Sequence, residues 1–410
     1  MLWGTCSTRS SGKCLLMLLE NCSYLRDDRV RREAKTLAVA GYRVIVIAPS
    51  AKGEGWHEKV DGVSVYRFPA SPASTGFLGY LWEYGYSMVV IFAMSLFVFL
   101  REGFDIIHAH HPPDILAFIP AFFKLFGVRY VLDHHDLAPE LYYARFGGRG
   151  NVLVYRILVW LERLSCRLAD HVITTNQSYK AVEMQRGRVP QQRISIVRNG
   201  PDSNELRCTG ADPALRKNGK TILGYVGVMG TQDGVDYLLR ALHYLVYKLG
   251  RIDFFCVLVG SGNALPSLKC LAQELCLTDY VSFTGWVEDQ ADVARYISSM
   301  DICIAPEPSD PYNDRSTAAK VMEYMALGKP TVAFDLPEHR FTAREAAVYA
   351  RPNDESDFAE QIALLMDDPY LRTRMGQEGR DRIEKELGWH HQAKALLKAY
   401  VTLFTQNSAE

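Results

Sequence analysis

Short apolar runs alternate with longer amphipathic stretches along the first half of this chain. Most of the runs are bounded by polar or turn residues and have the length of a buried strand. The strands predicted in this half are 14–19, 43–48, 106–107, 130–132 and 172–174, and the clearest helices are 29–40 and 152–168. Strands that alternate with helices in this way are typical of a parallel sheet with helices on both faces.

The second half repeats this pattern after a break. Residues 198–202 have a turn-rich sequence and 204–220 is polar, which indicates a linker between domains. The strands predicted beyond it are 221–226, 254–259, 281–283, 302–304 and 331–334, with helices at 235–249, 265–276 and 290–298. The fold class is therefore α/β, with two doubly wound, Rossmann-like domains. Ligands of such sheets bind beyond the carboxyl ends of the strands, so the predicted site is the cleft between the domains.

Composition is that of a large globular protein with an uneven charge distribution. The 410 residues are 48% hydrophobic and 23% charged, and the formal net charge is -1. Residues 1–200 hold 24 Lys and Arg against 17 Asp and Glu, while the rest hold 22 against 30. The basic half favours an anionic surface or acceptor, although two domains of opposite charge would show the same balance. Nine cysteines without a C-x-x-C pair favour the cytoplasm over a disulfide framework or zinc ribbon.

Two apolar segments have features of targeting signals. The segment 14–19 is too short for a signal-peptide core and runs into polar residues, so no secretory signal is expected. The run 84–100 carries no charge and reaches the lower length limit of a membrane span, about 17 residues. Strands of one sheet are predicted on both sides of it, so we do not expect it to span. The segment 77–100 is then either a helix buried in the domain or a helix in the membrane interface.

The stretch 315–330 carries the strongest candidate chemistry. Its polar start at 314–317, the glycine at Gly328 and a proline two residues later predict a helix with clear ends. Unpaired N–H groups and the positive end of the helix dipole make such a start an anion site. Lys320 lies one turn in, and Glu323 follows on the same face. This arrangement suits a nucleotide, with phosphates at the helix start and a carboxylate for the ribose hydroxyls.

An ordered set of motifs covers nearly the whole chain. In the second half these are Y-V-G-V-M-G-T-Q-D-G-V-D-Y-L-L-R-A-L at Tyr225, V-G-S-G-N-A-L-P-S-L at Val259, V-S-F-T-G-W-V at Val281 and E-Y-M-A-L-G-K-P-T-V-A at Glu323. In the first half they are D-R-V-R-R-E-A-K-T-L-A-V-A-G-Y-R-V-I-V-I-A-P at Asp28 and I-I-H-A-H-H-P-P-D at Ile106. Together they resemble the family 4 retaining glycosyltransferases, which have the GT-B fold, far more specifically than any one glycine motif.

The resemblance implies domains at 1–200 and 201–394, an acceptor side and a nucleotide-sugar donor side, with a helix at about 395–410 crossing back to the first. The residues expected to act in catalysis are His110, Lys320 and Glu323. Those expected to bind the donor are Gly230, Trp286, Val287, Arg315, Ser316, Thr317, Ala318, Lys320, Glu323, Arg198 and Asn199. Those expected on the acceptor or sugar side are Asp28, Arg29, His111, His135, Asp136 and Glu140.

Three positions depart from the family pattern. The signature E-x7-E begins here with Arg315, so a sugar-contacting carboxylate is missing or is replaced by Asp310 or Asp314. The phosphate-binding arginine and lysine of the family correspond to Val228 and Asp233. The departures indicate either a subgroup with another phosphate arrangement or an inactive protein. Plainer interpretations also stay open, since a glutamate at 323 can pair with Lys320 on its helix, and glycines near 230 are common in turns.

The expected activity is transfer of a sugar from a nucleotide-diphosphate sugar, with retention and without a metal or other cofactor. UDP is favoured by family frequency. The expected acceptor is a saccharide or a polyprenyl-linked saccharide at the cytoplasmic face of the membrane, with peripheral contact through 77–100 and no nucleic-acid partner. One alternative is a metal-dependent hydrolase with ligands at His108, His110, His134 and His135. Another is an inactive sugar-nucleotide-binding protein.

Overall fold

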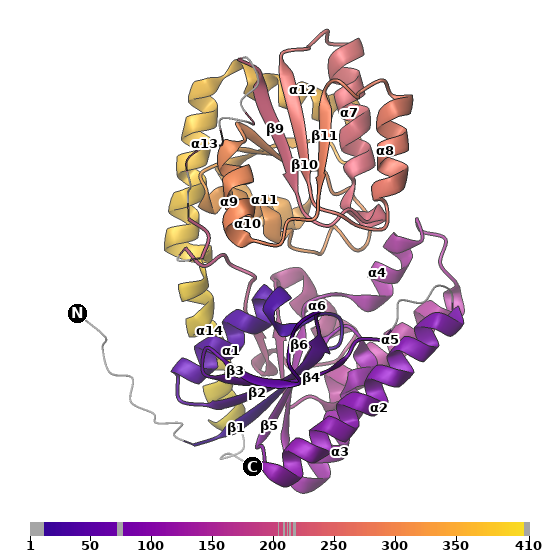
Figure 1. Cartoon of the computed structure of the whole chain (residues 1–410), viewed down its shortest axis with the longest axis vertical. Helices are drawn as coiled ribbons and strands as arrows, with labels where there is room; N and C mark the ends of the chain where they lie inside the picture. Colours follow the sequence, from indigo (N-terminus) through magenta and orange to yellow (C-terminus); the bar gives the residue numbers. More distant parts are fainter. Residues whose placement is uncertain are drawn as a thin grey trace, which may run out of the picture. The chain divides into compact units, whose positions relative to one another are not determined.

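The computed structural model describes residues 12–71, 77–203 and 219–405, together with 205–207, 210, 212 and 215. The chain divides into two compact units. The first unit comprises Met1–Ala138, Leu153–Val197 and Ala393–Glu410, and the second comprises Pro139–Val152 and Arg198–Gln392. Each unit is an α/β domain built around one sheet (Figure 1). The predicted fold class of two doubly wound domains is confirmed.

The first unit contains an eight-stranded sheet in the order β3-β4-β2-β1-β5-β6-β7-β8. Its strands are β1 (Cys14–Leu18), β2 (Arg43–Ser50), β3 (His57–Val60), β4 (Val63–Pro69), β5 (Ile106–His111), β6 (Arg129–His134), β7 (His171–Thr174) and β8 (Ile194–Ile196). All neighbours are parallel except β3 and β4, which form an antiparallel pair at one edge. The strands expected from the apolar runs are present, whereas β3, β4 and β8 were not expected from the sequence.

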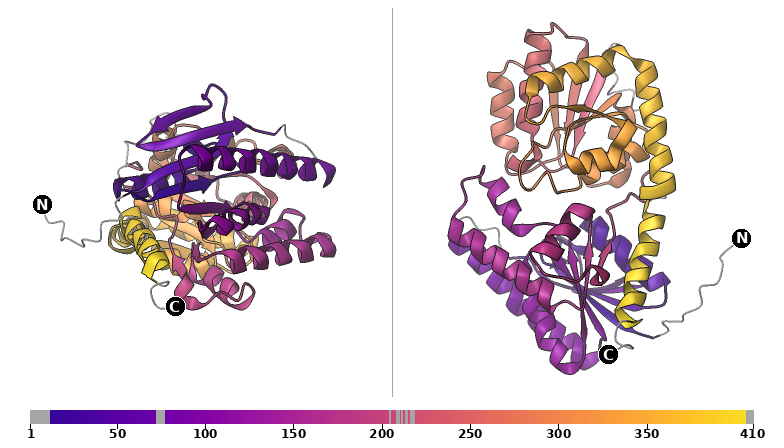
Figure 2. Two further views of the ribbon diagram at one scale, coloured as in Figure 1. Left: turned by 90° about the horizontal axis from the view of Figure 1, so that it is seen from below. Right: turned by 180° about the vertical axis from the view of Figure 1, so that it is seen from behind.

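Helices cover both faces of this sheet (Figure 2). The helices with residues in this unit are α1 (Asp28–Val39), α2 (Phe77–Arg101), α3 (Phe118–Phe123), α5 (Val152–Leu168), α6 (Gln177–Gln185) and α14 (Trp389–Thr405). One face packs against α2 and α3, where Ile91, Val98 and Phe123 are fully buried with Ile107 and Ala109 of β5. The opposite face of β5 carries His108 and His110 and is next to α1 and α14. One face of this strand is therefore apolar and the other carries histidines.

The second unit contains a six-stranded parallel sheet in the order β11-β10-β9-β12-β13-β14. Its strands are β9 (Thr221–Val226), β10 (Phe254–Val259), β11 (Val281–Gly285), β12 (Ile302–Ala305), β13 (Thr331–Phe334) and β14 (Ala347–Ala350). Its helices are α4 (Ala138–Arg145), α7 (Val235–Tyr247), α8 (Leu265–Glu274), α9 (Gln290–Ser299), α10 (Ala319–Ala326), α11 (Pro337–Ala343), α12 (Glu355–Asp367) and α13 (Pro369–Arg382). The larger apolar core joins this sheet to α7 and α12.

The helix predicted at 315–330 is shorter than expected. It begins at Ala319, and the residues before it form a separate turn. The carboxylate of Asp310 accepts hydrogen bonds from the backbone N–H groups of Tyr312 and Asn313, at 2.7 Å each. The Ser316 N–H then bonds to the Tyr312 carbonyl at 3.0 Å. A local side-chain acceptor therefore stabilises a turn where the polar sequence had predicted the first turn of the helix.

Candidate functional site

A cavity of about 310 Å³ lies at the carboxyl ends of β9 and β12 in the second unit. This is the sheet edge at which doubly wound domains bind their ligands. Its floor comes from the ends of the two strands, and its wall comes from the turn before α10 and the first turns of that helix. The residues that line it include Val226, Gly227, Val228, Asp233, Glu307, Ser316, Thr317, Ala318, Lys320, Glu323 and His339.

Lys320 is the cationic side chain that contacts the carboxylates of this cavity. Its ammonium forms an ion pair with Glu307, donates to the Tyr225 hydroxyl at 3.1 Å and lies 3.7 Å from an oxygen of Asp233. The ammonium also lies 4.5 Å from the centroid of the Tyr225 ring. His339 completes the group, with Nε2 3.7 Å from the second oxygen of Glu307. The lysine is thus held in place by several partners before any ligand binds.

The charges in the cavity shift one another's pKa values. Burial opposes ionisation of Glu307, but Lys320 and His339 more than offset this and hold the pKa of Glu307 below its usual value. Burial also opposes the charge on Lys320, yet the two carboxylates raise the pKa of Lys320 well above its usual value. For Asp233 burial is dominant, and the pKa of this carboxyl group is raised despite Lys320. Asp233 is therefore more easily neutralised by a proton than Glu307 is.

Two glycines allow the backbone to close tightly at the strand ends. Gly260 follows β10 with a φ of +133°, and a Cβ at this position would collide with the main-chain oxygen of Gly227. Gly227 follows β9 with a φ of +153°, and a Cβ there would lie 3.0 Å from the side chain of Lys320. Any larger residue would either displace the strand ends or push Lys320 away.

The turn before α10 is anchored on both sides. The Asn313 amide donates to the carbonyls of Gln232 and Pro308 at 2.9 and 3.0 Å. The Thr317 hydroxyl donates to Glu338 at 3.2 Å, and the Arg198 guanidinium lies 3.4 Å from the same hydroxyl. These bonds fix the backbone just before α10. The first N–H groups of a helix generally lack carbonyl partners within it, so the start of α10 is suited to an anion.

The structure brings together part of the predicted donor set. Ser316, Thr317, Ala318, Lys320 and Glu323 all line the cavity, and Glu323 is half-buried there. The Ser316 N–H, which was expected to bind phosphate, bonds to the Tyr312 carbonyl within the turn, and its role at the donor stays a prediction.

Other predicted donor residues are not part of the cavity's lining. Trp286 and Val287 follow β11 directly, and Trp286 is exposed. The Gly230 N–H donates to Asp233 at 2.9 Å, and Arg315 donates to the Pro311 carbonyl at 2.6 Å. Arg198 is buried, and Asn199 follows it in the chain. The roles given to these residues stay predictions.

A further carboxylate of the cavity, Glu307, was not predicted from the sequence. Asp310 caps the turn, and Asp314 accepts from the Ser309 hydroxyl at 2.9 Å. Both carboxylates that were expected to replace the missing sugar-contacting glutamate therefore form hydrogen bonds within the loop. Glu307 comes two residues after the end of β12 and is followed by a proline. Its position just beyond a buried strand was the signal that could have identified it.

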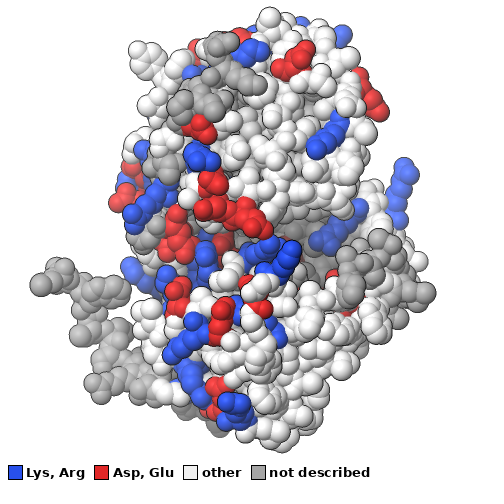
Figure 3. All heavy atoms as spheres, viewed as in Figure 1, with Lys and Arg blue, Asp and Glu red and all other residues white. Residues whose placement is uncertain are grey.

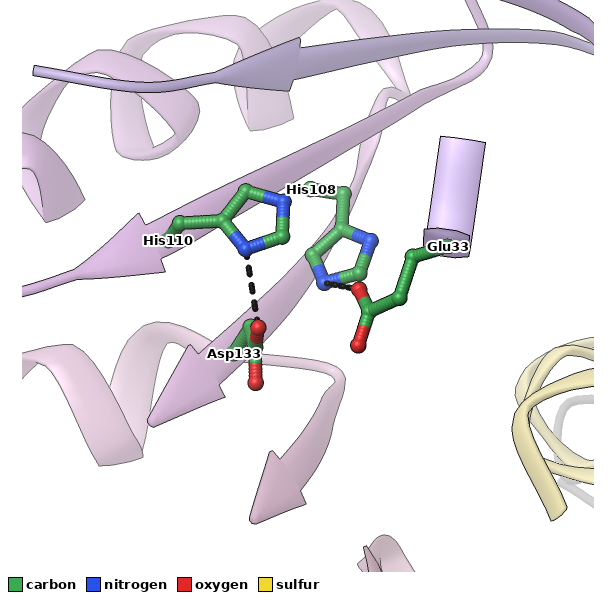
Figure 4. Close-up of side chains that lie close together, drawn as sticks. All are labelled: Glu33, His108, His110 and Asp133. Carbon is green, nitrogen blue, oxygen red and sulfur yellow. Dashed lines mark hydrogen bonds and ion pairs between the residues drawn. The ribbon is translucent and has the colours of Figure 1, made fainter. Parts of the chain in front are cut away.

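In the first unit, Glu33, His108, His110 and Asp133 form a buried group (Figure 4), and the Arg29 guanidinium bonds to it. Both oxygens of Asp133 accept from the Arg29 guanidinium at 2.7 Å, and one also lies 2.8 Å from Nδ1 of His110. Arg29 also bonds to the Val197 carbonyl at 2.9 Å. Arg29 is only 6% exposed and holds Asp133 in place, and its role as an acceptor contact stays a prediction.

Glu33 and His108 extend this group. His108 Nε2 lies 3.7 Å from Glu33, and its Nδ1 is 2.9 Å from the Tyr400 hydroxyl of α14. Burial raises the pKa of Glu33 well above its usual value, with Asp133 adding to the effect against the opposing Arg29 charge. Burial also lowers the pKa of His108 well below its usual value. The structure therefore favours a protonated, neutral Glu33 beside a neutral His108.

Ligand atoms of Glu33, His108, His110 and Asp133 lie within 4.8 Å of one another, close enough in principle to hold a metal ion. The Arg29 guanidinium argues against a cation there, because it already occupies both oxygens of Asp133 and lies 3.2 Å from Glu33. A metal would have to displace this buried positive charge. The site fits an internal hydrogen-bond network better than a metal centre.

The alternative metal-hydrolase site is not assembled by the structure. His134 lies on the opposite face of the sheet from His108 and His110, because alternate residues of a strand point to opposite faces. There its Nδ1 lies 3.2 Å from Glu183, and Glu162 lies 4.0 Å from its Nε2. Burial opposes the charge on His134, but these two carboxylates raise its pKa to about 9. The four-histidine interpretation was therefore wrong.

The remaining predicted residues of the first half have varied surroundings. His111 is fully buried on the same face as His134, with Nδ1 3.0 Å from Asp114. Asp28 is partly exposed and pairs with Arg31 at 2.9 Å. Nδ1 of His135 lies 3.6 Å from Asp133.

Asp136 follows β6, and Glu140 is buried in the first turn of α4. Their acceptor roles stay predictions.

The two-domain fold is shared with solved structures of glycosyltransferases. Sucrose-phosphate synthase from Thermosynechococcus elongatus matches with a TM-score of 0.78 at 19% identity, over 96% of this chain and all of that one. Alr3699/HepE of Anabaena, in a complex with UDP-glucose, matches with a TM-score of 0.71 at 15% identity, over 95% of this chain and 99% of that one. TM-scores of this size establish the fold, which is GT-B.

Family models match both halves of the chain. The model described as "Glycosyl transferase 4-like domain" matches residues 27–200, and the model "Glycosyl transferases group 1" matches residues 211–382. The phosphatidyl-myo-inositol mannosyltransferase of Mycobacterium leprae is 24% identical over 74% of this chain and 75% of its own length. The chain therefore belongs to the family 4 type of GT-B glycosyltransferases.

Proposed function

We propose that the protein is a retaining glycosyltransferase that moves a hexosyl or N-acetylhexosaminyl group from a UDP-sugar to a saccharide or lipid-linked acceptor. Its place would be polysaccharide or glycoconjugate biosynthesis at the cytoplasmic face of the membrane. The observation that carries the proposal is the cavity at the carboxyl ends of β9 and β12, with Lys320 and Glu323 in its lining at the start of α10. Such a helix start attracts a diphosphate.

In this proposal the diphosphate binds at the first N–H groups of α10 and beside Lys320. The ammonium and the helix amides stabilise the negative charge that develops on the leaving diphosphate, and they do so without rearranging. Glu323 accepts hydrogen bonds from the ribose hydroxyls. Because these groups supply the positive potential that a divalent ion would otherwise supply, we propose that transfer needs no metal.

Binding of the donor changes the charge balance of the cavity. The site already contains Glu307 and Asp233, and both compete with a diphosphate for Lys320. The pKa of Asp233 is raised by burial, and an added diphosphate would raise it further. We propose that Asp233 takes up a proton when the donor binds, which leaves Lys320 to the ligand.

The UDP assignment is supported by the fold relative HepE, whose structure contains UDP-glucose. The main chain at Trp286 and Val287, at the end of β11, is the proposed contact of the base, and Arg198 and Asn199 are proposed to contribute to the donor site. His110, at the end of β5 in the first unit, is the proposed contact of the transferred sugar.

The acceptor side is proposed to meet a membrane through α2. Its segment Trp82–Arg101 is the one described helix that is long and apolar enough to cross a membrane by length and composition, and 22% of its most apolar window is buried. Val89 and Leu100 of this helix are 70% and 77% exposed. A largely uncharged surface covers this part of the first unit (Figure 3).

The neighbouring helix α5 adds to this surface. Leu153, Ile157 and Trp160 are all exposed and follow the spacing of one helix face. Exposed arginines at 156, 163 and 167 accompany them. Apolar side chains mixed with arginines suit the interface of an anionic membrane, and the named relative from Mycobacterium leprae acts on phosphatidyl-myo-inositol, a lipid.

Vesicle binding tests the membrane contact. We expect the protein to sediment with phosphatidylglycerol-containing vesicles and the variant Val89→Glu/Leu100→Glu to lose most of this binding. The matched control Ile252→Glu/Tyr370→Glu changes two exposed apolar residues of the second unit and should bind as before. Equal binding of both variants would contradict the role of α2.

Turnover of the donor tests the activity itself. We expect release of UDP from at least one UDP-hexose or UDP-N-acetylhexosamine in the presence of EDTA. The variant Lys320→Met should lose this activity, whereas Arg240→Ala, at an exposed ion pair with Asp236, should keep it. Activity that depends on added metal would contradict the proposed chemistry.

The inactive sugar-nucleotide-binding protein remains the second candidate function. It is favoured by one observation: an acidic residue, Asp233, lies 3.7 Å from Lys320 where the family pattern has a cation. Such a protein would bind UDP-glucose with the same dependence on Glu323 and release no UDP. The two candidates are separated by measuring binding and turnover on the same sample.

A further inference from the structure

A second cavity, of about 250 Å³, lies within the first unit. It is formed at the carboxyl ends of β1, β2 and β4, and α2 closes one side with Glu83 and Ser87. The carboxyl ends of strands are where a doubly wound sheet exposes a binding site. None of the candidate site residues named from the sequence lines this cavity, so it belongs to no site described above.

The polar groups of this cavity suit a ligand that donates hydrogen bonds. Glu20 and Glu83 both line it, and the Ser87 hydroxyl donates to Glu20 at 2.8 Å. Burial raises the pKa of Glu20, and the nearby charge of Glu83 raises it further. Arg26 is the one cationic side chain in the lining, so carboxylates outnumber cations. An anionic ligand would meet repulsion here, whereas sugar hydroxyls would find acceptors.

A buried hydroxyl in the lining has no protein partner. Ser23 is 5% exposed, and its Oγ has no hydrogen-bond partner among the residues that the structure describes. A buried polar atom of this kind costs free energy unless a ligand or water satisfies it. Phe68 supplies an apolar, 2% exposed surface in the same cavity, which suits the C–H groups of a pyranose ring.

The size of the cavity limits its ligand to a small unit. At about 30 Å³ for each water molecule of the liquid, the volume corresponds to about eight waters. That is the scale of a monosaccharide and too small for an oligosaccharide. We propose that this cavity binds one uncharged, hydroxyl-bearing sugar unit of the acceptor, through Glu20, Glu83 and Ser23. This inference rests on the proposed glycosyltransferase function.

The position of α2 connects this site to the membrane surface proposed above. Glu83 and Ser87 line the cavity from the same helix whose Val89 and Leu100 are exposed. A sugar unit attached to a membrane lipid and a free sugar offer the same hydroxyls, so both fit the cavity. The two sources are distinguished by the experiment.

The test measures saturation-transfer NMR of methyl glycosides of glucose, galactose, mannose and N-acetylglucosamine with the full chain, beside glucose 6-phosphate. We expect transfer to at least one neutral glycoside and at least tenfold weaker binding of the phosphate. Ala51→Phe places a ring in the cavity and should abolish the signal. Lys52→Phe, the same change at the next and exposed residue, should keep it. No transfer to any glycoside, or an unchanged signal in Ala51→Phe, overturns the proposal.

A second variant guards against loss of folding in Ala51→Phe. Ser23→Ala removes the unpartnered hydroxyl, so it should leave the unfolding midpoint unchanged or higher and weaken binding of the glycoside severalfold. Unchanged binding in this variant removes Ser23 from the site and overturns the proposal as stated. The second arm uses vesicles that contain a glycolipid with the same sugar. Binding that is stronger with the glycolipid than without it, and that is lost in Val89→Glu, identifies the lipid-linked source.

The failure of this inference differs from a failure of the proposed function. UDP-glucose binding by Ala51→Phe should equal that of the natural sequence, because the donor cavity is a separate cavity in the second unit. Turnover of a UDP-sugar without binding of any glycoside would contradict the sugar-binding role of this cavity and leave the proposed glycosyltransferase activity intact. Glycoside binding without any nucleotide binding would remove the transferase instead.

Discussion

Replacement of Lys320 by Met should expose the energetic cost of the charge pair in the donor cavity. Lys320→Met keeps the length and apolar contacts of the stem, but leaves Glu307 buried at 6% exposure without its cation. Removal of one partner from a buried pair typically destabilises a protein by 3–5 kcal/mol. His339 remains 3.7 Å from Glu307, and the cavity admits water, so we expect the lower end, about 3 kcal/mol.

The double variant Lys320→Met/Glu307→Gln separates the pair from the packing. Because the buried charge is gone, it should recover about half or more of the lost stability, which double-mutant analysis of urea unfolding measures for the second unit's transition. Glu307→Gln alone should bind UDP-glucose at least as tightly as the natural sequence, since a competitor for the ammonium is removed. If Lys320→Met costs less than about 0.5 kcal/mol, the ion pair does not anchor the lysine and the reasoning is refuted.

Three further predictions concern pH and backbone geometry. The pKa of His134 is raised from 6.5 to about 9, which gives about 3 kcal/mol of stability that is present below pH 6.5 and lost as the pH rises through 9. The variant His134→Gln ends the pairing with Glu183, so its free energy of unfolding should change little over this pH range. Gly260→Ala should cost about 1–3 kcal/mol of stability and weaken UDP-glucose binding, because the new Cβ collides with the backbone. The control Gly285→Ala is also at positive φ but faces open space, so it should retain binding. Unfolding measures the stability of both variants, and titration calorimetry measures their binding. Affinity for UDP-glucose should rise as the pH falls from neutral toward the raised pKa of Asp233, and Asp233→Asn should bind more tightly with that dependence lost.

Strands that are buried on both faces could be predicted closely from the sequence. The strands β9, β10 and β13 have the bounds expected from their apolar runs, and α5 has the bounds of its amphipathic stretch. The strand β3 was missed because it is almost wholly exposed and carries His-Glu-Lys, a composition that no strand pattern detects. Edge strands lack the burial that produces the pattern.

The donor cavity could be predicted in part. A helix with Lys320 and Glu323 on one face was visible in the sequence, and both residues line the cavity. The true start of α10 was not visible, because Asp310 caps a turn by side-chain bonds that a polar sequence does not specify. Glu307 was missed because its partner Lys320 lies on another element, and pairs between elements leave no spacing in the sequence.

The histidines of the first unit show the same limit. The periodicity of a strand places His108 and His110 on one face, and the structure confirms this. That Arg29 from α1 would hold Asp133 behind them could not be inferred from spacing, since the two residues are far apart in the chain and meet only through packing. A residue expected to contact the acceptor is therefore part of the domain's interior.

The most direct test of the central claim is thermal stabilisation by UDP, GDP and ADP and their sugars, without and with EDTA, in the natural sequence and in Glu323→Ala. A ligand at 100 times its dissociation constant adds about 2.7 kcal/mol of stability. We predict stabilisation by uridine nucleotides that is indifferent to EDTA and lost in Glu323→Ala, with Arg240→Ala behaving as the natural sequence does. No response to any nucleotide, or equal stabilisation of Glu323→Ala, would contradict a nucleotide-sugar site at the start of α10.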